Sequence, residues 1–207
     1  MKHIKPSRAF HRGRRMLQVR RRILIVCEGA KTEKLCFHAA RRELRLTGTT
    51  IEIIGGDECG TAPKSIVEYA KEMNKQAKRK REPFDATWCV FDRDDHLKIH
   101  EATQQAAGNG YEVAFSNPSF ELWFLLHFQE QSAHIERDIV LKELRGYLPR
   151  YEKGVDVYDE LRPHQHLALE RSPKLRDYHM QAFEPPNKNP STTVDKLVNY
   201  LHSQKTA

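Results

Sequence analysis

Short apolar runs alternate with longer amphipathic stretches through the first half of the chain. The apolar runs predict strands at 23–27, 50–54, 86–91 and 111–115. The stretches between them predict helices at about 32–46, 63–79 and 97–107, with a loop at 55–60. Strands that alternate with helices of this length favour parallel βαβ units joined by right-handed crossovers.

Beyond Pro118 the pattern becomes predominantly helical. Residues 119–128 form a strongly apolar stretch, which predicts a helix that is buried on most sides. A last helix is expected to begin near residues 191–193, where serine and threonine are good N-cap residues. The fold class is therefore α/β, with a Rossmann-like core and a mainly parallel sheet. We expect three parts, which are a basic arm at 1–20, the α/β core at 21–128 and a helical extension at 129–207 packed on the core.

Charge is distributed unevenly along the 207 residues. Residues 1–22 hold nine of the 35 Lys and Arg residues and no acid, whereas the rest, with 26 basic and 28 acidic residues, has a net charge of −2. Such an arm could contact a phosphate backbone or could simply be a solubilising terminus. The candidate nucleic-acid contacts in it are Arg14, Arg15, Arg20, Arg21 and Arg22.

A second basic run, Lys75–Arg81, carries five Lys or Arg residues at the end of a predicted helix. Cations at a helix C-terminus complement the helix dipole, which could explain the run, although contact with nucleic acid is the alternative.

The apolar runs are all far shorter than the roughly 18 residues of a membrane span. No apolar segment follows the basic N-terminus as it would in a signal peptide, so we expect a cytoplasmic protein without membrane contact.

Acidic residues follow two of the predicted strands. Asp92, Asp94 and Asp95 come directly after the strand at 86–91, and Glu28 follows the strand at 23–27 and precedes Gly29. Functional groups of doubly wound sheets gather at the carboxyl ends of strands, beside the topological switch point. If these two strands are neighbours there, Glu28, Asp92 and Asp94 converge and can bind Mg²⁺ or Mn²⁺.

A bare cluster of this kind would be unstable without a cation or raised pKa values. The competing interpretation is a solvated loop that caps the next helix, and it fits Asp95 best. Glu33, in the first turn of a helix, either complements the dipole or serves as a further metal ligand. Glu121 stands on the apolar helix, where a carboxylate needs a cation or a hydrogen-bonded partner, so it is a ligand or a capping acid. Lys31 and Arg93 either offset phosphate charge or are solvated at the surface.

Four segments carry a family resemblance. They are Ile25–Glu33, Val90–His96, Ser116–Trp123 and Asn189–Thr192. Together and in this order they resemble the RloB-like family of TOPRIM proteins, with similarity over about residues 21–202. The TOPRIM domain is shared by topoisomerases, bacterial primases and OLD-family nucleases.

The resemblance implies Mg²⁺-dependent phosphodiester chemistry, and hence a nuclease of bacterial defence against phage by abortive infection. By position, Glu28, Asp92 and Asp94 match the TOPRIM acids, in which the Asp pair resembles metal ligands and the glutamate is a ligand or a general acid/base. Relatives of this kind tend to occur with a partner ATPase, so the expected partners are nucleic acid, such an ATPase and further copies of the chain.

Three functions are therefore considered for the chain. The first is a metal-dependent nuclease that cuts DNA or RNA. The second is a non-catalytic subunit of a defence complex that binds nucleic acid or an ATPase. The third, a phosphohydrolase with an Asp-x-Asp pair, is disfavoured because those enzymes place the pair on the first strand of the fold rather than the third.

Overall fold

The computed structural model describes residues 21–46, 49–93, 99–181 and 188–205. The arm with Arg14, Arg15 and Arg20 lies outside these residues, and so does Asp94. The interpretation of these four residues therefore stays a prediction.

A five-stranded sheet runs through the molecule in the order β2-β1-β3-β4-β5. Its strands are β1 (Arg21–Cys27), β2 (Thr49–Ile54), β3 (Ala86–Asp92), β4 (Glu112–Asn117) and β5 (Ser191–Thr192). The first four are parallel, and β5 pairs antiparallel with β4. The four predicted strands are therefore confirmed. The last helix begins at Val194 with Thr193 as its N-cap residue, close to where it was expected, and residues 191–192 just before it form an edge strand that the sequence did not indicate.

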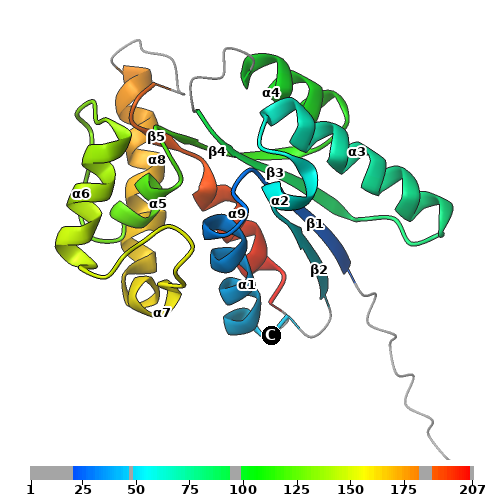
Figure 1. Ribbon diagram of the computed structural model, residues 1–207, viewed down its shortest axis with the longest axis horizontal. Coiled ribbons are helices and arrows are strands. Elements are labelled where there is room, and N and C mark those ends of the chain that lie inside the picture. The colour runs from blue at the N-terminus through cyan, green and yellow to red at the C-terminus, as the bar shows by residue number, and fades with distance from the viewer. Residues whose placement is uncertain (1–20, 47–48, 94–98, 182–187, 206–207) are drawn as a thin grey trace, which may run out of the picture.

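Helices cover both faces of the sheet (Figure 1). One face is covered by α3 (Pro63–Arg79) and α4 (Ile99–Gly108), and the other by α1 (Thr32–Leu44) and α9 (Val194–Ser203). Along β1, Leu24 and Val26 pack toward the first pair of helices, while Ile23 and Ile25 pack toward the second. Burial on both faces explains why the strands are uninterrupted apolar runs. The predicted loop at 55–60 contains a short helix, α2 (Gly56–Cys59).

The remaining helices form a layer beside β4 and β5 (Figure 1). They are α5 (Glu121–Leu125), α6 (Arg137–Tyr147), α7 (Tyr158–Leu161), the 3₁₀ helix η1 (Arg162–His164) and α8 (Gln165–Gln181). The predicted helix at 119–128 is shorter than expected, but it is buried as expected, because every side chain from 120 to 126 is at most 3% exposed. A domain boundary at residue 128 stays a prediction.

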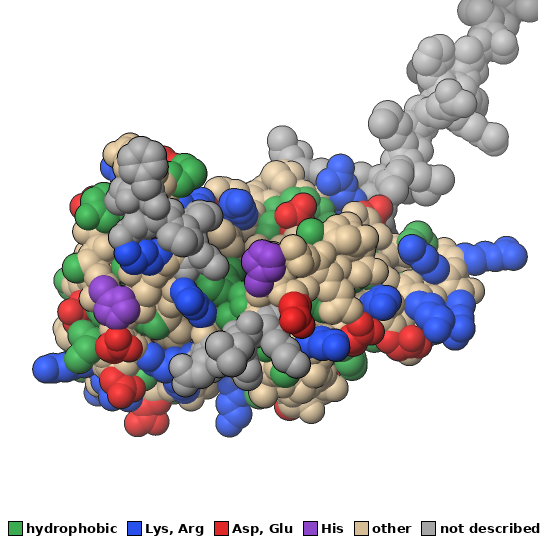
Figure 2. All heavy atoms as spheres, turned by 90° about the horizontal axis from the view of Figure 1, so that it is seen from above, with side chains coloured by type: hydrophobic (Ala, Val, Ile, Leu, Met, Phe, Trp, Pro, Cys, Tyr) green, Lys and Arg blue, Asp and Glu red, His purple; other side chains and the backbone are tan. Residues whose placement is uncertain are grey.

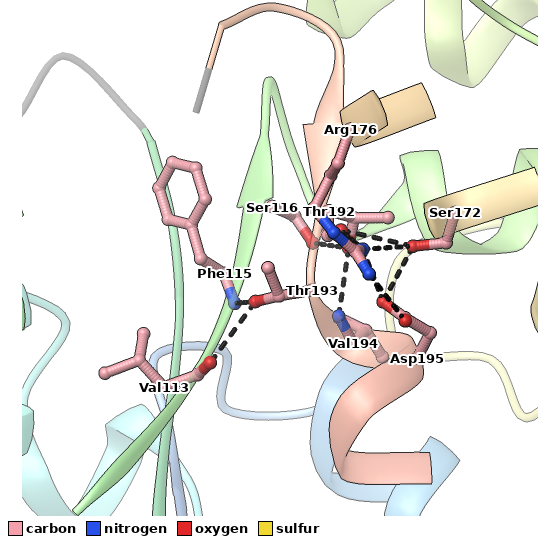
Figure 3. A network of polar contacts seen from close by, with 9 residues as sticks. All are labelled: Val113, Phe115, Ser116, Ser172, Arg176, Thr192, Thr193, Val194 and Asp195. Carbon is pink, nitrogen blue, oxygen red and sulfur yellow. Dashed lines mark hydrogen bonds and ion pairs between the residues drawn. The ribbon is translucent and has the colours of Figure 1, made fainter. Parts of the chain in front are cut away.

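Figure 3 shows how the edge strand β5 is attached to the sheet. The Oγ1 atom of Thr193 accepts a hydrogen bond from the Phe115 N–H group at 2.9 Å, and the Ser116 and Thr192 hydroxyls pair at 3.0 Å. Behind them, Arg176 binds both carboxylate oxygens of Asp195, at 2.7 and 2.9 Å. This buried network fixes the carboxyl end of β4, and with it the corner that leads into α5.

Two features of this architecture matter for function. The order of strands reverses between β1 and β3, so the topological switch point of this Rossmann-like sheet lies between them. Helix α1 follows β1 and helix α4 follows β3, and these two helices pack on opposite faces of the sheet. Within the described ranges, no helix is both long and apolar enough to cross a membrane.

Candidate active site

Glu28 and Asp92 meet at the switch point. The pairing of β1 with β3 ends at Cys27 and Val90, and the Glu28 N–H group continues it by donating to the Val90 carbonyl at 2.8 Å. The Glu28 side chain then turns across to β3, where its Oε2 atom accepts a hydrogen bond from the Asp92 N–H group at 2.9 Å. The condition stated from the sequence, that the two strands are neighbours, is therefore met.

A pocket of about 470 Å³ opens beside this pair. Four acids line it together with three cations, namely Glu28, Glu33, Asp92 and Glu121 with Lys31, Arg137 and Lys153. All four acids are buried, with exposed fractions between 3% and 8%. Charge is therefore concentrated in a place with little access to water, where Coulomb interactions are strong.

Asp92 is in an electrostatically unfavourable position. Burial raises its pKa well above the ordinary value, and the nearby carboxylates of Glu33, Glu28 and Glu121 raise it further. The backbone N–H group of Phe120 opposes this rise. A carboxyl group that is desolvated and surrounded by like charges becomes more favourable as an anion when positive charge is added to the cluster.

Glu33 folds back over the turn that follows β1. A Cβ atom on Gly29 would lie 1.7 Å from Oε2 of Glu33, so glycine is the residue that leaves this carboxylate in its present position. Burial raises the pKa of Glu33, Glu121 adds to the rise, and the backbone N–H groups of Glu33 and Gly29 oppose it. The side chain thus lines the pocket while it also sits at the start of α1, so both of the roles considered for it remain open.

Glu121 reaches the pocket from the corner after β4. The Tyr151 hydroxyl donates a hydrogen bond to its Oε1 atom at 3.3 Å, and the ammonium group of Lys153 lies 3.8 Å from the same oxygen. The carboxylate is thus only partly compensated by a half-exposed cation, although it is 3% exposed itself. This matches the expectation that a carboxylate on an apolar helix needs partners.

Arg137 and Lys153 are pocket residues that the sequence did not indicate. Arg137 begins α6, and its guanidinium group lies 3.4 Å from Oδ2 of Asp92. Lys153 lies in the segment after α6, which is tied to α1 by a hydrogen bond of 3.1 Å from the Gly154 N–H group to Thr32. Both are single cations in polar segments, and only tertiary packing brings them to the acids.

The predicted cationic contacts lie in different places. Lys31 lines the pocket and packs over Gly154, whereas Arg93 is exposed after β3 and is not among the described residues that line it. Arg21 and Arg22 lie at the opposite, amino edge of the sheet, where they contact Gln204 at 2.8 Å and Glu52 at 2.6 Å. Arg22 in particular has a structural role there, because its guanidinium group also stacks on Phe84 at 4.7 Å.

The donors of the pocket suit a hard divalent cation in kind and in charge. Carboxylate oxygens are the ligands that Mg²⁺ and Mn²⁺ prefer. Among the residues that the structure describes, no three His, Cys, Asp or Glu side chains are placed closely enough to hold an ion. Asp94, the second acid of the predicted pair, is outside those residues. The metal-binding roles of Glu28, Asp92, Glu33 and Glu121 therefore stay predictions.

These observations define a Rossmann-like α/β protein with a buried acidic pocket at its switch point. A family model described as "RloB-like protein" matches residues 23–201, which is most of the chain. The chain therefore belongs to the RloB-like family. No curated protein and no solved structure matches it.

Proposed function

We propose that this protein is a metal-dependent nuclease that hydrolyses phosphodiester bonds in DNA or RNA with Mg²⁺ or Mn²⁺. The observation that carries the proposal is the position of Asp92, which is buried in a pocket with three further carboxylates that raise its pKa. Carboxylates with perturbed pKa values that gather in a cleft are typical of functional sites. Their location at the switch point is where ligands bind in open α/β sheets.

The residues of the pocket divide into two sets in this proposal. Asp92, Asp94 and Glu28 would hold the metal, as the TOPRIM interpretation of their positions implies, and Glu33 and Glu121 would complete the acidic wall. A bound divalent ion would lower the pKa of the attacking water and offset charge on the scissile phosphate. Glu28 is held for this role by the Asp92 N–H group, so its carboxylate needs little reorganisation.

The cations of the pocket would bind the phosphate groups of the substrate. Arg137 offers a planar guanidinium group that matches phosphate geometry, and it already lies beside Asp92. Lys153 is half exposed at the rim, and Lys31, which packs over the neighbouring Gly154, is exposed as well. Such contacts would position the backbone of the nucleic acid but would not read its sequence.

The biological setting is part of the same proposal. Membership of the RloB-like family supports it through the resemblance described above, which implies a role in abortive infection and action with a partner ATPase. Further copies of the chain are also candidate partners.

A cleavage assay with end-labelled DNA and RNA, in Mg²⁺ and in Mn²⁺, tests the proposal. Asp92→Asn and Glu28→Gln should each lower the cutting rate by about 100-fold or more, because each removes a group that acts on the reacting phosphate. Asp159→Asn, on the exposed side of α7, is the matched control and should cut normally. If all these proteins bind nucleic acid and none cuts it, with or without an ATPase partner, the non-catalytic subunit replaces the nuclease.

A further inference from the structure

A second concave site lies at the opposite edge of the sheet from the acidic pocket. This groove, of about 500 Å³, runs between the second half of α3 and the turn from α4 to β4. We call it the basic groove, and it is lined by Lys71, Asn74, Lys75, Lys78, Arg79, Asn109 and Tyr111. Four of these seven residues are cationic and none is acidic. Figure 2 shows Lys and Arg side chains gathered at this end of the molecule, where α3 ends.

The helix dipole does not account for this concentration of charge. Its effect is confined to the last turn of a helix, which explains Lys78 and Arg79 but not Lys71 and Lys75, one to two turns earlier. The four cations recur at spacings of three and four residues, so they share one face of α3. Like charges at such spacings destabilise a helix, so helix stability is not a reason to place them there.

The acidic residues of α3 neutralise the positive charge of this face only in part. Glu68 and Glu72 approach Lys71 and Lys75 at 3.6 and 3.8 Å, and both pairs are about half exposed. Exposed pairs of this length contribute little and leave the ammonium groups open to another anion. Across the described part of the chain, no carboxylate forms an ion pair with Lys78 or Arg79. The groove therefore keeps a net positive charge.

The floor of the groove is polar and fixed. The side-chain amide of Asn74 donates to the Ala70 carbonyl and to the Thr87 hydroxyl, at 2.9 Å each. Tyr111 is partly buried on the other side, where burial raises its pKa, and the side-chain amide of Asn109 donates a hydrogen bond of 2.7 Å to the Gln105 carbonyl. A hydrogen-bonded polar floor beside exposed cationic side chains suits a ligand with several phosphate groups and little apolar surface.

Helix α3 connects the basic groove to the acidic pocket. Thr61, just before the helix, lines the pocket, and Lys71 and Arg79 follow Pro63 by 8 and 16 residues along α3. At 1.5 Å per residue the groove therefore extends from about 12 to about 24 Å beyond the start of the helix. Successive base pairs of a duplex are about 3.4 Å apart, so this reach corresponds to about seven base pairs.

We propose that the basic groove binds the sugar–phosphate backbone of a nucleic acid, at up to about seven base pairs from the acidic pocket. The choice of nucleic acid over other polyanions rests on the proposed function of that pocket. The groove then serves as a second contact that holds the substrate and gives no sequence preference, because its cations meet phosphates rather than base edges.

The test measures binding without cutting. Fluorescence anisotropy with labelled DNA and RNA duplexes of about 20 base pairs, in EDTA and between about 50 and 200 mM salt, gives the slope of log K against log salt concentration. The groove variant is Lys75→Gln/Lys78→Gln/Arg79→Gln. The control variant, Lys142→Gln/Arg150→Gln/Lys196→Gln, makes the same charge change at exposed positions that line neither site. Glutamine is a good helix former, and circular dichroism checks that both variants fold.

Each phosphate contact contributes about 0.9 to the slope, so the groove variant should bind with a slope shallower by about 3, while the control keeps the wild-type slope. Equal slopes for the two variants would overturn the proposal, and so would a wild-type protein that binds neither duplex. Because EDTA abolishes metal-dependent cutting, this result is independent of the cleavage assay. A nuclease whose groove variant binds normally would therefore refute the groove alone.

Discussion

Replacing Gly29 by alanine tests whether the turn after β1 is built around the carboxylate of Glu33. A Cβ atom at position 29 would lie 1.7 Å from Oε2 and 2.6 Å from Oε1 of Glu33, and contacts of a Cβ atom under 3.0 Å are essentially never seen. Gly29 itself is not among the glycines with positive φ, so alanine is compatible with its backbone. The clash with Glu33 is therefore the main effect, and the carboxylate must move by about 1 Å or more.

The clashing atoms are the end of a flexible side chain and can swing aside, so the cost arises from the hydrogen bonds to the Gly29 and Glu33 N–H groups that the buried carboxylate then loses, about 1–3 kcal/mol of the free energy of unfolding. The same substitution should cost almost nothing when Glu33 is first replaced by alanine, because the space is then empty. A double-mutant cycle of Gly29→Ala and Glu33→Ala, measured by urea unfolding, should give a coupling free energy of about 1–3 kcal/mol. The displaced carboxylate would also leave the acidic wall, so Gly29→Ala should weaken Mn²⁺ binding by about 10- to 100-fold.

Gly146→Ala is the matched control for this cycle. No heavy atom would lie within 4 Å of a Cβ atom there, near the end of α6, so alanine should stabilise the protein by about 0.5–1 kcal/mol in either background. If Gly29→Ala destabilises the protein equally with and without the Glu33 side chain, the carboxylate of Glu33 does not occupy the space beside Gly29.

Three further predictions concern other parts of the fold. Gly56→Ala should destabilise the protein by about 1–3 kcal/mol, because its Cβ atom would lie 2.0 Å from the Glu28 carbonyl oxygen. Burial lowers the pKa of His127 to about 4, so stability should fall as the pH drops from about 6.5 toward 4, by about 3 kcal/mol in total, and His127→Gln should lack this contribution. Arg176→Leu should cost about 3–5 kcal/mol in urea unfolding, because it leaves the buried Asp195 carboxylate without its opposite charge and with the Ser172 hydroxyl as its side-chain donor.

Each of these predictions has an outcome that contradicts it. Unchanged stability of Gly56→Ala would mean that α2 does not rest against the end of β1. Parallel curves of stability against pH for the wild type and His127→Gln would show that the histidine is not held neutral in the fold. An Arg176→Leu/Asp195→Leu protein should be closer to the wild type than Arg176→Leu alone, and failure of this rescue would argue against the ion pair.

The parallel part of the sheet could be predicted from the sequence because its strands are buried on both faces. Residues such as Leu24 and Ile25 point to opposite sides and are both fully buried, which produces an uninterrupted apolar run. The edge strand β5 could not be predicted, because it has two residues and pairs with β4 more than 70 residues earlier. Its serine and threonine satisfy the local rule for a helix N-cap equally well, and only the tertiary partner decides between them.

The candidate site could also be predicted from the sequence only in part. Glu28 and Asp92 could be placed together from the sequence because both end neighbouring strands, and the switch-point rule concerns strand ends. Arg137 and Lys153 could not be placed there from the sequence. Arg137 approaches the acids from α6, which packs against α5, and Lys153 from a segment that is tied to α1, so both positions depend on tertiary packing. The segment Asn189–Thr192, which carries part of the family resemblance, has a structural role in the fold. The Asn189 amide pairs with both backbone groups of Ile135, at 3.0 and 2.9 Å, and β5 continues from there.

The central claim is that the acidic pocket binds a divalent cation through Asp92 and its neighbours. Isothermal titration calorimetry with Mn²⁺, comparing the wild type with Asp92→Asn/Asp94→Asn, tests it most directly. We expect saturable binding by the wild type that the double variant loses while it remains folded, since two of the three proposed charged ligands are removed. Equal affinity in the two proteins, or no binding by the wild type with nucleic acid both absent and present, would contradict it.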